Sequence, residues 1–230
     1  MAKKGKLIVI DGADGSGKAT QTKLLVARLN KAGYRVKTLD FPRYESNFFG
    51  KFIGECLGGK HGDFLALSPY IASIVYDIDR WESRVELVRA LEQGFVVVLD
   101  RYVSANQIHQ GSKIQNTRKR KQFLAWLEQM DFEIFKLPRP DLTLYLNVPY
   151  SVSRGLLKQK GNRLKKVYLG KGKQDQAEGS ELHQELSRKY ALELISQKKH
   201  FLKVDCFEKQ TFLSPETIHE KIWKTIEPIL

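Results

Sequence analysis

The chain has 230 residues, 42% of them hydrophobic, and a formal net charge of +13, so it can bury a sizeable core and suits anionic partners. Its two cysteines form no C-x-x-C pair, which argues against a zinc site or a disulfide framework. The N-terminal apolar run is too short for a signal peptide, and no run approaches the length of a membrane span. We therefore expect a soluble, cytoplasmic protein with no membrane partner.

Apolar runs of strand length alternate with amphipathic stretches along the chain. The first strand, 6–11, leads through a glycine-rich loop into a helix over 18–33 that stops at Gly33. Further strands are predicted at 34–41, 95–100, 141–148 and 200–207. Further helices are predicted at 48–59, 68–94, 117–135 and 214–230. This alternation indicates an α/β fold in which helices cover both faces of a parallel sheet.

One stretch, at about 158–180, fits neither a strand nor a helix. It is polar, basic and interrupted by glycines, and we expect it to be a mobile insertion. No internal repeat and no low-complexity linker divide the sequence, so residues 1–230 are predicted to form a single domain.

The glycine-rich loop reads GADGSGKAT over residues 12–20 and nearly matches the phosphate-binding pattern G-x-x-x-x-G-K-[ST]. Between a strand and a helix, its backbone N–H groups can form an anion nest, and the helix adds its positive N-terminal end. Lys18 would reach the terminal phosphates of a nucleoside triphosphate. The predicted ATP-binding residues are Gly12, Asp14, Gly15, Ser16, Gly17, Lys18, Ala19 and Thr20.

Ala19 departs from this pattern, because a hydroxyl at its position usually helps to hold Mg²⁺. Mg²⁺ readily keeps several waters, so a water or a nearby carboxylate can replace that ligand. Asp14 in the loop and Asp100 at the end of a strand are the candidate metal ligands, whereas Thr20 points further round the helix. The sequence of the loop alone does not exclude an inactive protein that has lost its metal site.

A second group of polar residues is predicted at the same edge of the sheet. Asp100 and Arg101 follow a buried strand, where ligands of open parallel sheets bind, and Arg101 suits a phosphate. Tyr76 and Arg80 are four residues apart on a helix and share a face, so they could stack on a base and bond its edge. The alternative for Asp100 and Arg101 is a salt bridge at the end of the strand. The alternative for the helix is that Tyr76 belongs to the core and Arg80 to the surface.

Several segments together resemble the thymidylate kinases, which are P-loop nucleoside monophosphate kinases that phosphorylate dTMP with ATP. The matching segments, within about residues 6–150, are GADGSGKATQ, FPRY, DRWE, DRYVSANQIHQG and PDLTLYLNV. The resemblance implies a three-layer P-loop NTPase fold with a five-stranded parallel sheet. It also implies a basic lid at about 158–180, a requirement for Mg²⁺ and a homodimer.

The resemblance also implies roles for individual residues. Tyr76 would stack on thymine and Arg80 would read the base edge, while Arg43 and Arg101 would contact the acceptor phosphate. Asp14 and Asp100 would belong to the metal end. Asn106, His109 and Gln110 would line the acceptor pocket. The residues expected to be catalytic are Lys18, Asp14, Asp100, Arg101 and Arg163.

Three departures from the family pattern bear on these roles. Arg43 is offset by one position from members that read F-P-x-R, and His109 stands where some members have a tyrosine. The loop carries Gly15 where some members have a basic residue, so the lid would supply the second cation. The candidates for that cation are Arg163, Lys165 and Lys166, unless they simply belong to a solvated loop.

Two alternative functions remain open from the sequence. One is a kinase for another nucleotide or for a nucleoside. The other is a non-catalytic P-loop protein that binds nucleic acid, which the basic run TRKRK at 117–121 favours. No aromatic residues are interleaved with that run, so binding to nucleic acid is the less favoured hypothesis.

Overall fold

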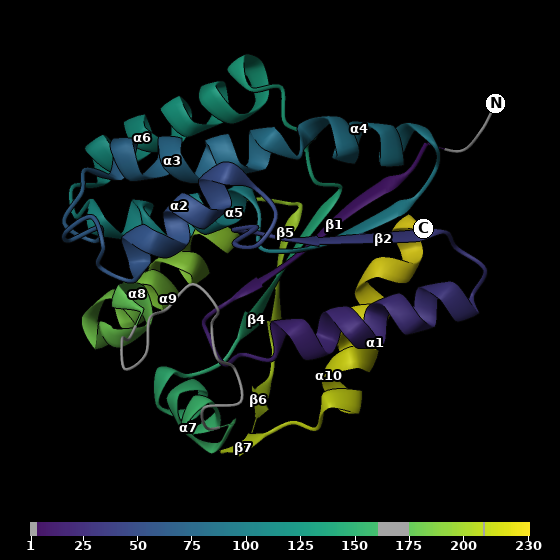
Figure 1. Ribbon diagram of the computed structural model, residues 1–230. Helices are drawn as coiled ribbons and strands as arrows, with labels where there is room; N and C mark the ends of the chain where they lie inside the picture. The colour runs from purple at the N-terminus through teal and green to yellow at the C-terminus, as the bar shows by residue number, and fades with distance from the viewer. Residues whose placement is uncertain (1–3, 161–174, 209) are drawn as a thin grey trace.

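Five parallel strands form a central sheet in the order β2-β3-β1-β4-β5 (Figure 1). The structure is a computed structural model that describes residues 4–160, 175–208 and 210–230. The strands are β1 (Lys6–Gly12), β2 (Val36–Asp40), β3 (Val96–Asp100), β4 (Leu142–Asn147) and β5 (Phe201–Asp205). All five predicted strands are confirmed. The three inner strands, β1, β3 and β4, are buried along most of their length, whereas the edge strands β2 and β5 are partly exposed.

The helices that cover the sheet are spread along the whole chain. They are α1 (Lys18–Lys31), α2 (Phe48–Leu57), α3 (Pro69–Glu82), α4 (Arg84–Glu92), α5 (Val103–His109), α6 (Thr117–Gln129), α7 (Tyr150–Lys160), α8 (Gln176–Gly179), α9 (Glu181–Ile195) and α10 (Pro215–Ile226). Short 3₁₀ turns lie at η1 (Gly111–Lys113) and η4 (Glu227–Ile229), and a π-helical turn, η2 (Met130–Ile134), follows α6. A small antiparallel pair, β6 (Phe207–Glu208) and β7 (Thr211–Phe212), follows β5. None of the described helices has the length and apolar character that crossing a membrane requires.

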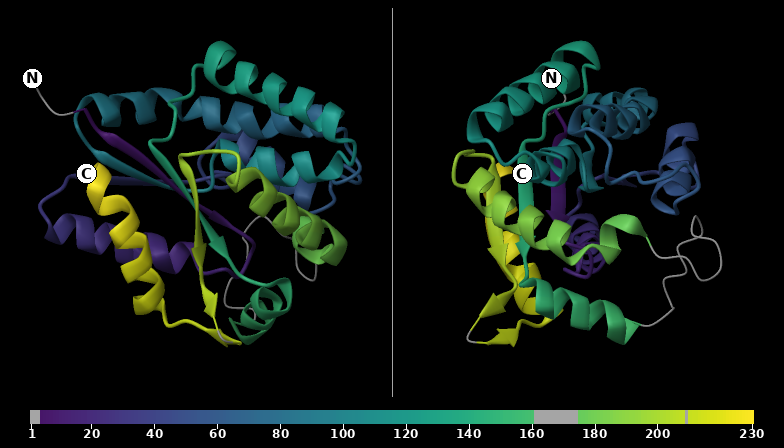
Figure 2. Two further views of the ribbon diagram at one scale, coloured as in Figure 1. Left: turned by 180° about the vertical axis from the view of Figure 1, so that it is seen from behind. Right: turned by 90° about the vertical axis from the view of Figure 1, so that its left-hand side faces the viewer.

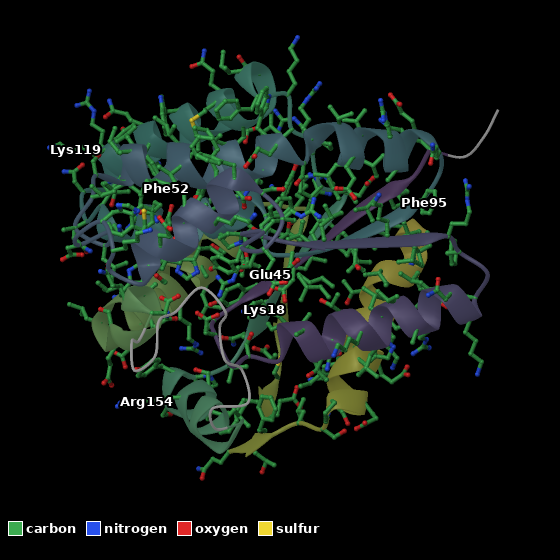
Figure 3. The ribbon with its side chains drawn as sticks, in the orientation of Figure 1. Lys18, Glu45, Phe52, Phe95, Lys119 and Arg154 are labelled. Carbon is green, nitrogen blue, oxygen red and sulfur yellow. The ribbon has the colours of Figure 1, made fainter. Side chains whose placement is uncertain are left out.

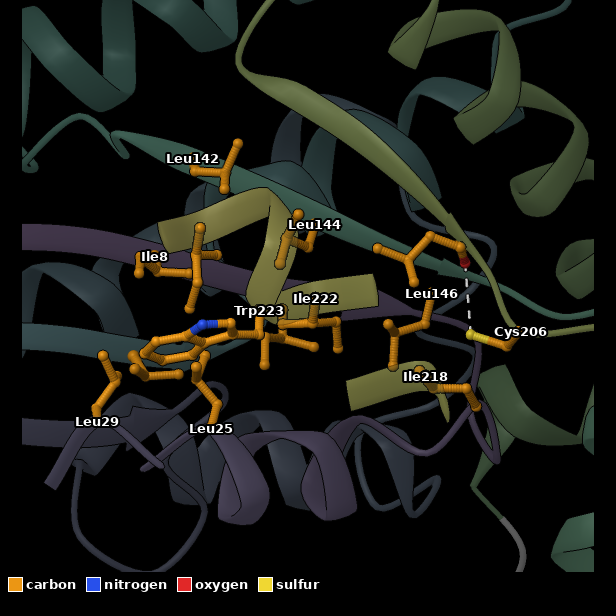
Figure 4. Close-up of a cluster of buried hydrophobic side chains, with 14 of the residues drawn as sticks. Ile8, Leu25, Leu29, Leu142, Leu144, Leu146, Cys206, Ile218, Ile222 and Trp223 are labelled. Carbon is orange, nitrogen blue, oxygen red and sulfur yellow. Dashed lines mark hydrogen bonds between the residues drawn. The ribbon is translucent and has the colours of Figure 1, made fainter. Parts of the chain in front are cut away.

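Alternate side chains of β1 face opposite layers. Ile8 and Ile10 pack with Leu25 of α1 and Ile222 of α10, in the cluster drawn in Figure 4. Leu7 and Val9 pack instead in a second cluster that includes Leu87 of α4. Figure 2 shows α1 and α10 together on one side of the sheet, and α3, α4 and α6 on the other. This three-layer arrangement buries both faces of the sheet, as the apolar runs predict.

The single helix predicted over 68–94 is wrong, because two helices, α3 and α4, occupy this stretch. Ser83 ends α3 and precedes α4 with φ −93° and ψ 0°. Its hydroxyl accepts hydrogen bonds from Arg43 NH1 at 3.0 Å and from Asn47 Nδ2 at 3.1 Å. These contacts come from a distant part of the chain, so the periodicity of 68–94 gives no sign of the break.

The sequence patterns predict no element where α5, α7 and α9 lie. The prediction that about 158–180 is neither strand nor helix is wrong at both ends, because α7 extends to Lys160 and α8 occupies Gln176–Gly179. The residues from 161 to 174 lie outside the described part of the chain. Arg163, Lys165 and Lys166, the candidate lid cations, fall within that range.

Candidate active site

The phosphate-binding loop joins β1 to α1 at the carboxyl edge of the sheet. Gly12 has φ 150°, and a Cβ there would lie 2.7 Å from Ser16 Oγ and 3.0 Å from the Leu146 carbonyl oxygen. Gly17 precedes α1 with φ 96°, a conformation that L side chains rarely adopt. The loop therefore requires glycine at both ends of the predicted motif, which is the geometry of an anion nest.

Lys18, the first residue of α1, folds back over this loop. Its Nζ donates to the carbonyl oxygens of Gly12 and Ala13, both at 3.0 Å, and lies 3.6 Å from Asp14 Oδ1. Burial and the charge of Arg101 lower the pKa of Lys18, while neighbouring carboxylates oppose that change. The amine is thus held beside the space that the loop encloses, with partners that a phosphate could replace.

Asp11 is a residue of this loop region that the sequence patterns do not single out. It is fully buried at the end of β1, where its Oδ1 accepts from the Gly12 N–H at 2.8 Å. Its Oδ2 accepts from Ser104 Oγ of α5 at 2.6 Å. Asp11 therefore ties the phosphate-binding loop to the helix that follows β3.

Arg101 lies between the phosphate-binding loop and α5. Its backbone has φ 65°, and its N–H donates to the Ile10 carbonyl oxygen at 2.9 Å. NH2 donates to Asp14 Oδ1 at 2.6 Å, and NH1 donates to His109 Nε2 at 3.0 Å. Burial and the Arg101 charge lower the pKa of His109, so its imidazole is neutral and accepts this bond. The Arg101 guanidinium therefore contacts both Asp14, a predicted metal ligand, and His109, a predicted residue of the acceptor pocket.

A cavity of about 720 Å³ runs from the phosphate-binding loop to the far end of α3. It is lined by most of the predicted site residues, namely Asp14, Gly15, Gly17, Lys18, Ala19, Arg43, Tyr76, Arg80, Asp100, Arg101, Asn106, His109 and Gln110. Figure 3 labels Lys18 at the start of α1 and Glu45 in the segment after β2, and both line this cavity. Gly12, Ser16 and Thr20 are not among the lining residues.

The far end of the cavity holds the predicted base-binding pair. The ring of Tyr76 meets Phe64 edge-on, with centroids 5.8 Å apart and an interplanar angle of 60°. Arg80 is only 2% exposed, and its NH1 donates to Asp77 on the same helix. Asn106 Nδ2 donates to the other oxygen of Asp77 at 2.7 Å. Arg80 is thus a buried cavity residue, and the alternative of a surface arginine is wrong.

The other residues of the DRWE segment support this end of the site. Asp79 accepts from the Arg43 backbone N–H at 3.1 Å and from Asn47 Nδ2 at 2.9 Å. Glu82 accepts from the N–H groups of Phe48 and Phe49, at 3.1 and 2.9 Å, at the start of α2. These two carboxylates hold the segment between β2 and α2, while Arg80 alone lines the cavity.

The structure turns the Arg43 guanidinium toward α4. Arg43 lines the cavity, but its NH1 donates to Ser83 Oγ at 3.0 Å and to Glu86 Oε2 at 2.8 Å. Glu86 also pairs with Lys37 at 2.9 Å. The contacts of NH1 are therefore with the break between α3 and α4 and with α4 itself.

Several further cavity residues are not found by sequence reasoning. Tyr44 belongs to the FPRY segment, but the motif directs attention to the arginine beside it. His183 of α9 stacks on His109, with centroids 5.5 Å apart and an interplanar angle of 29°. The amphipathic spacing of α9 could have revealed that helix. Others in this group are Glu45, Ser46, Asp175, Ala177 and Gln184.

The two predicted metal ligands differ in their surroundings. Asp14 bonds Arg101, whereas the Asp100 side chain makes no hydrogen bond or ion pair with any described residue. Burial raises the pKa of Asp100, and the charges of Lys18 and Arg101 oppose that rise. Across the described ranges, no group of three or more His, Cys, Asp or Glu could hold a metal ion by itself.

Comparisons with known proteins point to one family. A sequence model of that family, described as thymidylate kinase, matches residues 10–222. A thymidylate kinase of Mycobacterium tuberculosis is 33% identical over 192 residues, which cover 83% of this chain and 86% of that protein. A human thymidylate kinase is 33% identical over 147 residues, covering 64% of this chain and 63% of the human protein.

A solved structure supports the same relationship. The thymidylate kinase of Candida albicans superposes with a TM-score of 0.71 at 25% identity, over 98% of this chain and 92% of that chain. The sheet and its two helical layers are therefore those of a P-loop NTPase fold.

Proposed function

The chain belongs to the thymidylate kinase family, and on that premise we propose that it transfers the γ-phosphoryl group of ATP to dTMP. The observation that carries this proposal is the single cavity that joins the phosphate-binding loop, Arg101 and the Tyr76–Arg80 face. Donor and acceptor nucleotides can meet there without a covalent intermediate on the protein. The product would be dTDP, a precursor of dTTP.

The donor end would bind the phosphates of ATP. The N–H groups of residues 12–18 would cradle the β- and γ-phosphates, and Lys18 would exchange its carbonyl partners for phosphate oxygens. Mg²⁺ fits this end, because Asp100 offers a carboxylate with no partner among the described residues, and Asp14 lies beside it in the cavity lining. When bound, Mg²⁺ would neutralise phosphate charge, with waters taking the place of the hydroxyl that Ala19 lacks.

The acceptor phosphate would bind next to Arg101. The guanidinium is already held by Asp14 and His109, so it is oriented before a ligand arrives. The nucleophile is an anionic phosphate oxygen, so no general base is needed and positioning supplies most of the rate. Arg43 would assist only after its NH1 leaves Ser83 and Glu86.

The base end has the hydrogen-bonding groups of a partner for thymine. Arg80 can only donate, and both N–H groups of Asn106 are engaged by Asp77 and the Ser73 carbonyl oxygen, so Asn106 Oδ1 is left to accept. An adjacent donor and acceptor match the O4 and N3–H of thymine. They mismatch cytosine, in which an amino group and an unprotonated N3 reverse the pattern. The ring of Tyr76 would stack on the base, and Gln110 would line the pocket.

A second cation would help to neutralise the migrating phosphoryl group. Arg163, with Lys165 and Lys166 as alternatives, is proposed for this role from the sequence, because Gly15 leaves the loop without one. A cation of this kind contributes about 10³-fold or more to the rate of phosphoryl transfer.

The remaining proposals concern the whole chain. We propose one kinase domain over 1–230, since the sheet includes strands from Lys6 to Asp205. A homodimer is supported by exposed apolar side chains on α2, α3 and α4, which include Phe48 (73% exposed), Trp81 (51%) and Val85 (53%). A cytoplasmic location follows from the availability of ATP and dTMP there.

The alternative functions gain no support from the molecule. In the run 117–121, Arg120 pairs with Glu193 of α9 and covers the ring of Tyr190. The matched relatives are kinases by name, which leaves a nucleic-acid-binding role without a supporting observation.

The proposal is tested by coupled ADP release with ATP, Mg²⁺ and a panel of acceptors: dTMP, dUMP, dCMP, dGMP and thymidine. We expect the highest kcat/KM with dTMP and no turnover with thymidine, which lacks the acceptor phosphate. A preference for another acceptor would reassign the substrate. ATP binding without turnover on any acceptor would move the non-catalytic alternative to first place.

A further inference from the structure

One buried carboxylate contacts two residues that line the base end of the cavity. Asp77 of α3 is fully buried and does not itself line the cavity. Its Oδ1 accepts from Arg80 NH1 on the same helix, and its Oδ2 accepts from Asn106 Nδ2 of α5 at 2.7 Å. Asp77 therefore links α3 and α5 through the side chains of Arg80 and Asn106, which face the ligand space.

These contacts allow the Asn106 amide only one orientation. Its Nδ2 donates to Asp77 Oδ2 and, at 3.2 Å, to the Ser73 carbonyl oxygen. Both partners are acceptors, so a flipped amide would place its oxygen against them and leave buried groups unpaired. Asn106 Oδ1 is consequently the polar atom that remains for a ligand.

Asp77 holds both neighbours in this way as long as it is ionised. A second buried carboxyl, Asp131 of η2, lies near Asp77 and Arg80. Burial and the charge of Asp77 raise the pKa of Asp131 to about 9, so Asp131 carries a proton at neutral pH. Burial also raises the pKa of Asp77, but the Arg80 charge opposes that rise, and both Asp77 oxygens accept from donors.

We propose that Asp77 is a positioning residue that sets the hydrogen-bond polarity of the base pocket, holding Arg80 as the donor and turning Asn106 so that its oxygen accepts. This inference rests on the proposed function, and it assigns the preference of the enzyme for thymine to the contacts of Asp77. A 4-oxo pyrimidine with a protonated N3 meets this pair correctly. A 4-amino pyrimidine would place its amino group against the donor Arg80 and its unprotonated N3 against the acceptor Asn106 Oδ1.

The test is Asp77→Asn, assayed for kcat and KM with dTMP and dCMP at neutral pH. The new amide can accept from Arg80 with its oxygen, but its NH₂ group then faces Asn106 Nδ2. Asn106 has to flip, which presents N–H groups to the ligand. We expect the KM for dTMP to rise at least about tenfold with a smaller change in kcat, and the kcat/KM preference for dTMP over dCMP to fall at least about tenfold.

Asp131→Asn is the matched control, because it alters a carboxyl of the same buried cluster that is already neutral. We expect its KM for dTMP and its preference between the two nucleotides to stay within about twofold of the wild type. Asp77→Asn should still fold, since Asp131 can ionise and replace Asp77 as the counter-ion of Arg80. Thermal unfolding of both variants checks this.

If Asp77→Asn does not fold, the inference is tested with the double variant Asp77→Asn with Asn106→Asp, in which the carboxylate and the amide exchange places. The amide at position 77 can donate to the carboxylate at position 106, whose second oxygen still faces the ligand. The preference for dTMP over dCMP should then return, at a lower kcat/KM because the contact with the Ser73 carbonyl oxygen is lost.

A folded Asp77→Asn enzyme with the wild-type KM and the wild-type preference overturns the inference. An exchanged pair that folds but does not prefer dTMP overturns it as well. Both results can be told apart from failure of the proposed function. In that case the wild-type enzyme itself does not phosphorylate dTMP.

Discussion

Ala19 lies exposed at the start of α1 and lines the same cavity as Asp100. A hydroxyl at this position would give Mg²⁺ a ligand from the loop. Without it, that coordination position would be filled by Asp100, a phosphate oxygen or water. The surrounding loop keeps the glycine geometry and the lysine contacts that phosphate binding needs. Ala19 should therefore weaken the affinity for the metal without removing the activity.

The variant Ala19→Ser tests this account of the metal. Its hydroxyl is expected to lower the Mg²⁺ concentration for half-maximal activity about three- to tenfold, which corresponds to roughly one hydrogen-bond-sized increment of free energy. The measurement is a Mg²⁺ titration of the rate at saturating ATP. Ala27→Ser, on an exposed position of the same helix, should leave the titration unchanged. An unmoved midpoint in Ala19→Ser would mean that the metal is held elsewhere.

The neutral state of His109 makes a prediction about pH. Its pKa is lowered by burial and by Arg101 in the folded protein, so the unfolded chain takes up a proton near pH 6.5 that the folded chain does not. Stability should therefore fall as the pH drops below about 6.5, with up to about 1.4 kcal/mol per pH unit from this residue. His183, whose pKa burial lowers to about 4, adds in the same direction.

The free energy of unfolding in urea, measured between pH 7 and 5, checks this prediction. His109→Gln can still accept from Arg101 but cannot titrate, so its pH dependence should be shallower than that of the wild type. His200→Gln, at an exposed site, should keep the wild-type slope. Equal slopes for all three proteins would contradict a neutral, buried His109.

Individual site residues were predictable where a motif states both the residue and its backbone setting. The loop residues and Arg101 belong to this group, because each follows an apolar strand at the same edge of the sheet. The link between Asp77 and Asn106 was not predictable, since Asn106 and Asp131 approach Asp77 only after distant helices pack together. For the same reason, FPRY suggests Arg43 as a phosphate ligand, yet its NH1 contacts depend on Ser83 and Glu86.

At the scale of elements, the break between α3 and α4 matters because it presents a hydrogen-bond acceptor to the segment that follows β2. Ser83 receives hydrogen bonds from Arg43 and Asn47, so the segment after β2 is anchored at this break. The same segment carries Tyr44 and Glu45 into the cavity lining. The break thus anchors a segment that lines the acceptor end of the cavity.

Glu82 provides a test of how α2 is held. Asn47 precedes α2 without a side-chain cap, and the Glu82 carboxylate accepts from the first two N–H groups of α2 instead. Glu82→Ala should destabilise the protein by about 1 kcal/mol, as loss of an N-cap does. The measurement is the urea midpoint, with Glu92→Ala on an exposed site of α4 as control. An unchanged midpoint for Glu82→Ala would show that α2 needs no cap from α3.

The strands were predictable because each is a short apolar run between turn signals, and burial on both faces leaves no other choice for such runs. Helices α1, α2, α6 and α10 carry clear starts, stops or apolar periodicity. Helix α5 is only seven residues long and directly follows the Arg101 turn, so it lacks a period to detect. Helix α9 has a usable period, with Ser187, Tyr190, Ala191 and Leu194 buried, and was missed among polar neighbours.

At the scale of the whole molecule, the exposed apolar side chains on α2, α3 and α4 have a direct consequence for assembly. Phe48, Trp81 and Val85 are each more than half exposed. Exposed apolar side chains that gather in a patch are typical of an interaction surface. A second copy of the chain is the proposed partner.

Trp81→Asp tests the proposed dimer. A charge at this exposed apolar position should shift the protein toward the monomer by at least about tenfold in dissociation constant. Light scattering after gel filtration, over a range of concentrations, measures the shift. Leu182→Asp, on α9 and 68% exposed, is the control. A wild type that is monomeric at every concentration, or a Trp81→Asp variant as dimeric as the wild type, would contradict this interface.

The central claim is direct transfer between two nucleotides bound in one cavity. The most direct measurement is ³¹P NMR of the enzyme with equimolar ATP, dTMP and Mg²⁺, which follows every phosphorus atom at once. The account predicts that the γ-phosphate signal of ATP disappears as the signals of dTDP and ADP appear, with little inorganic phosphate. ADP and inorganic phosphate without dTDP would contradict it, because the cavity would then deliver the phosphoryl group to water.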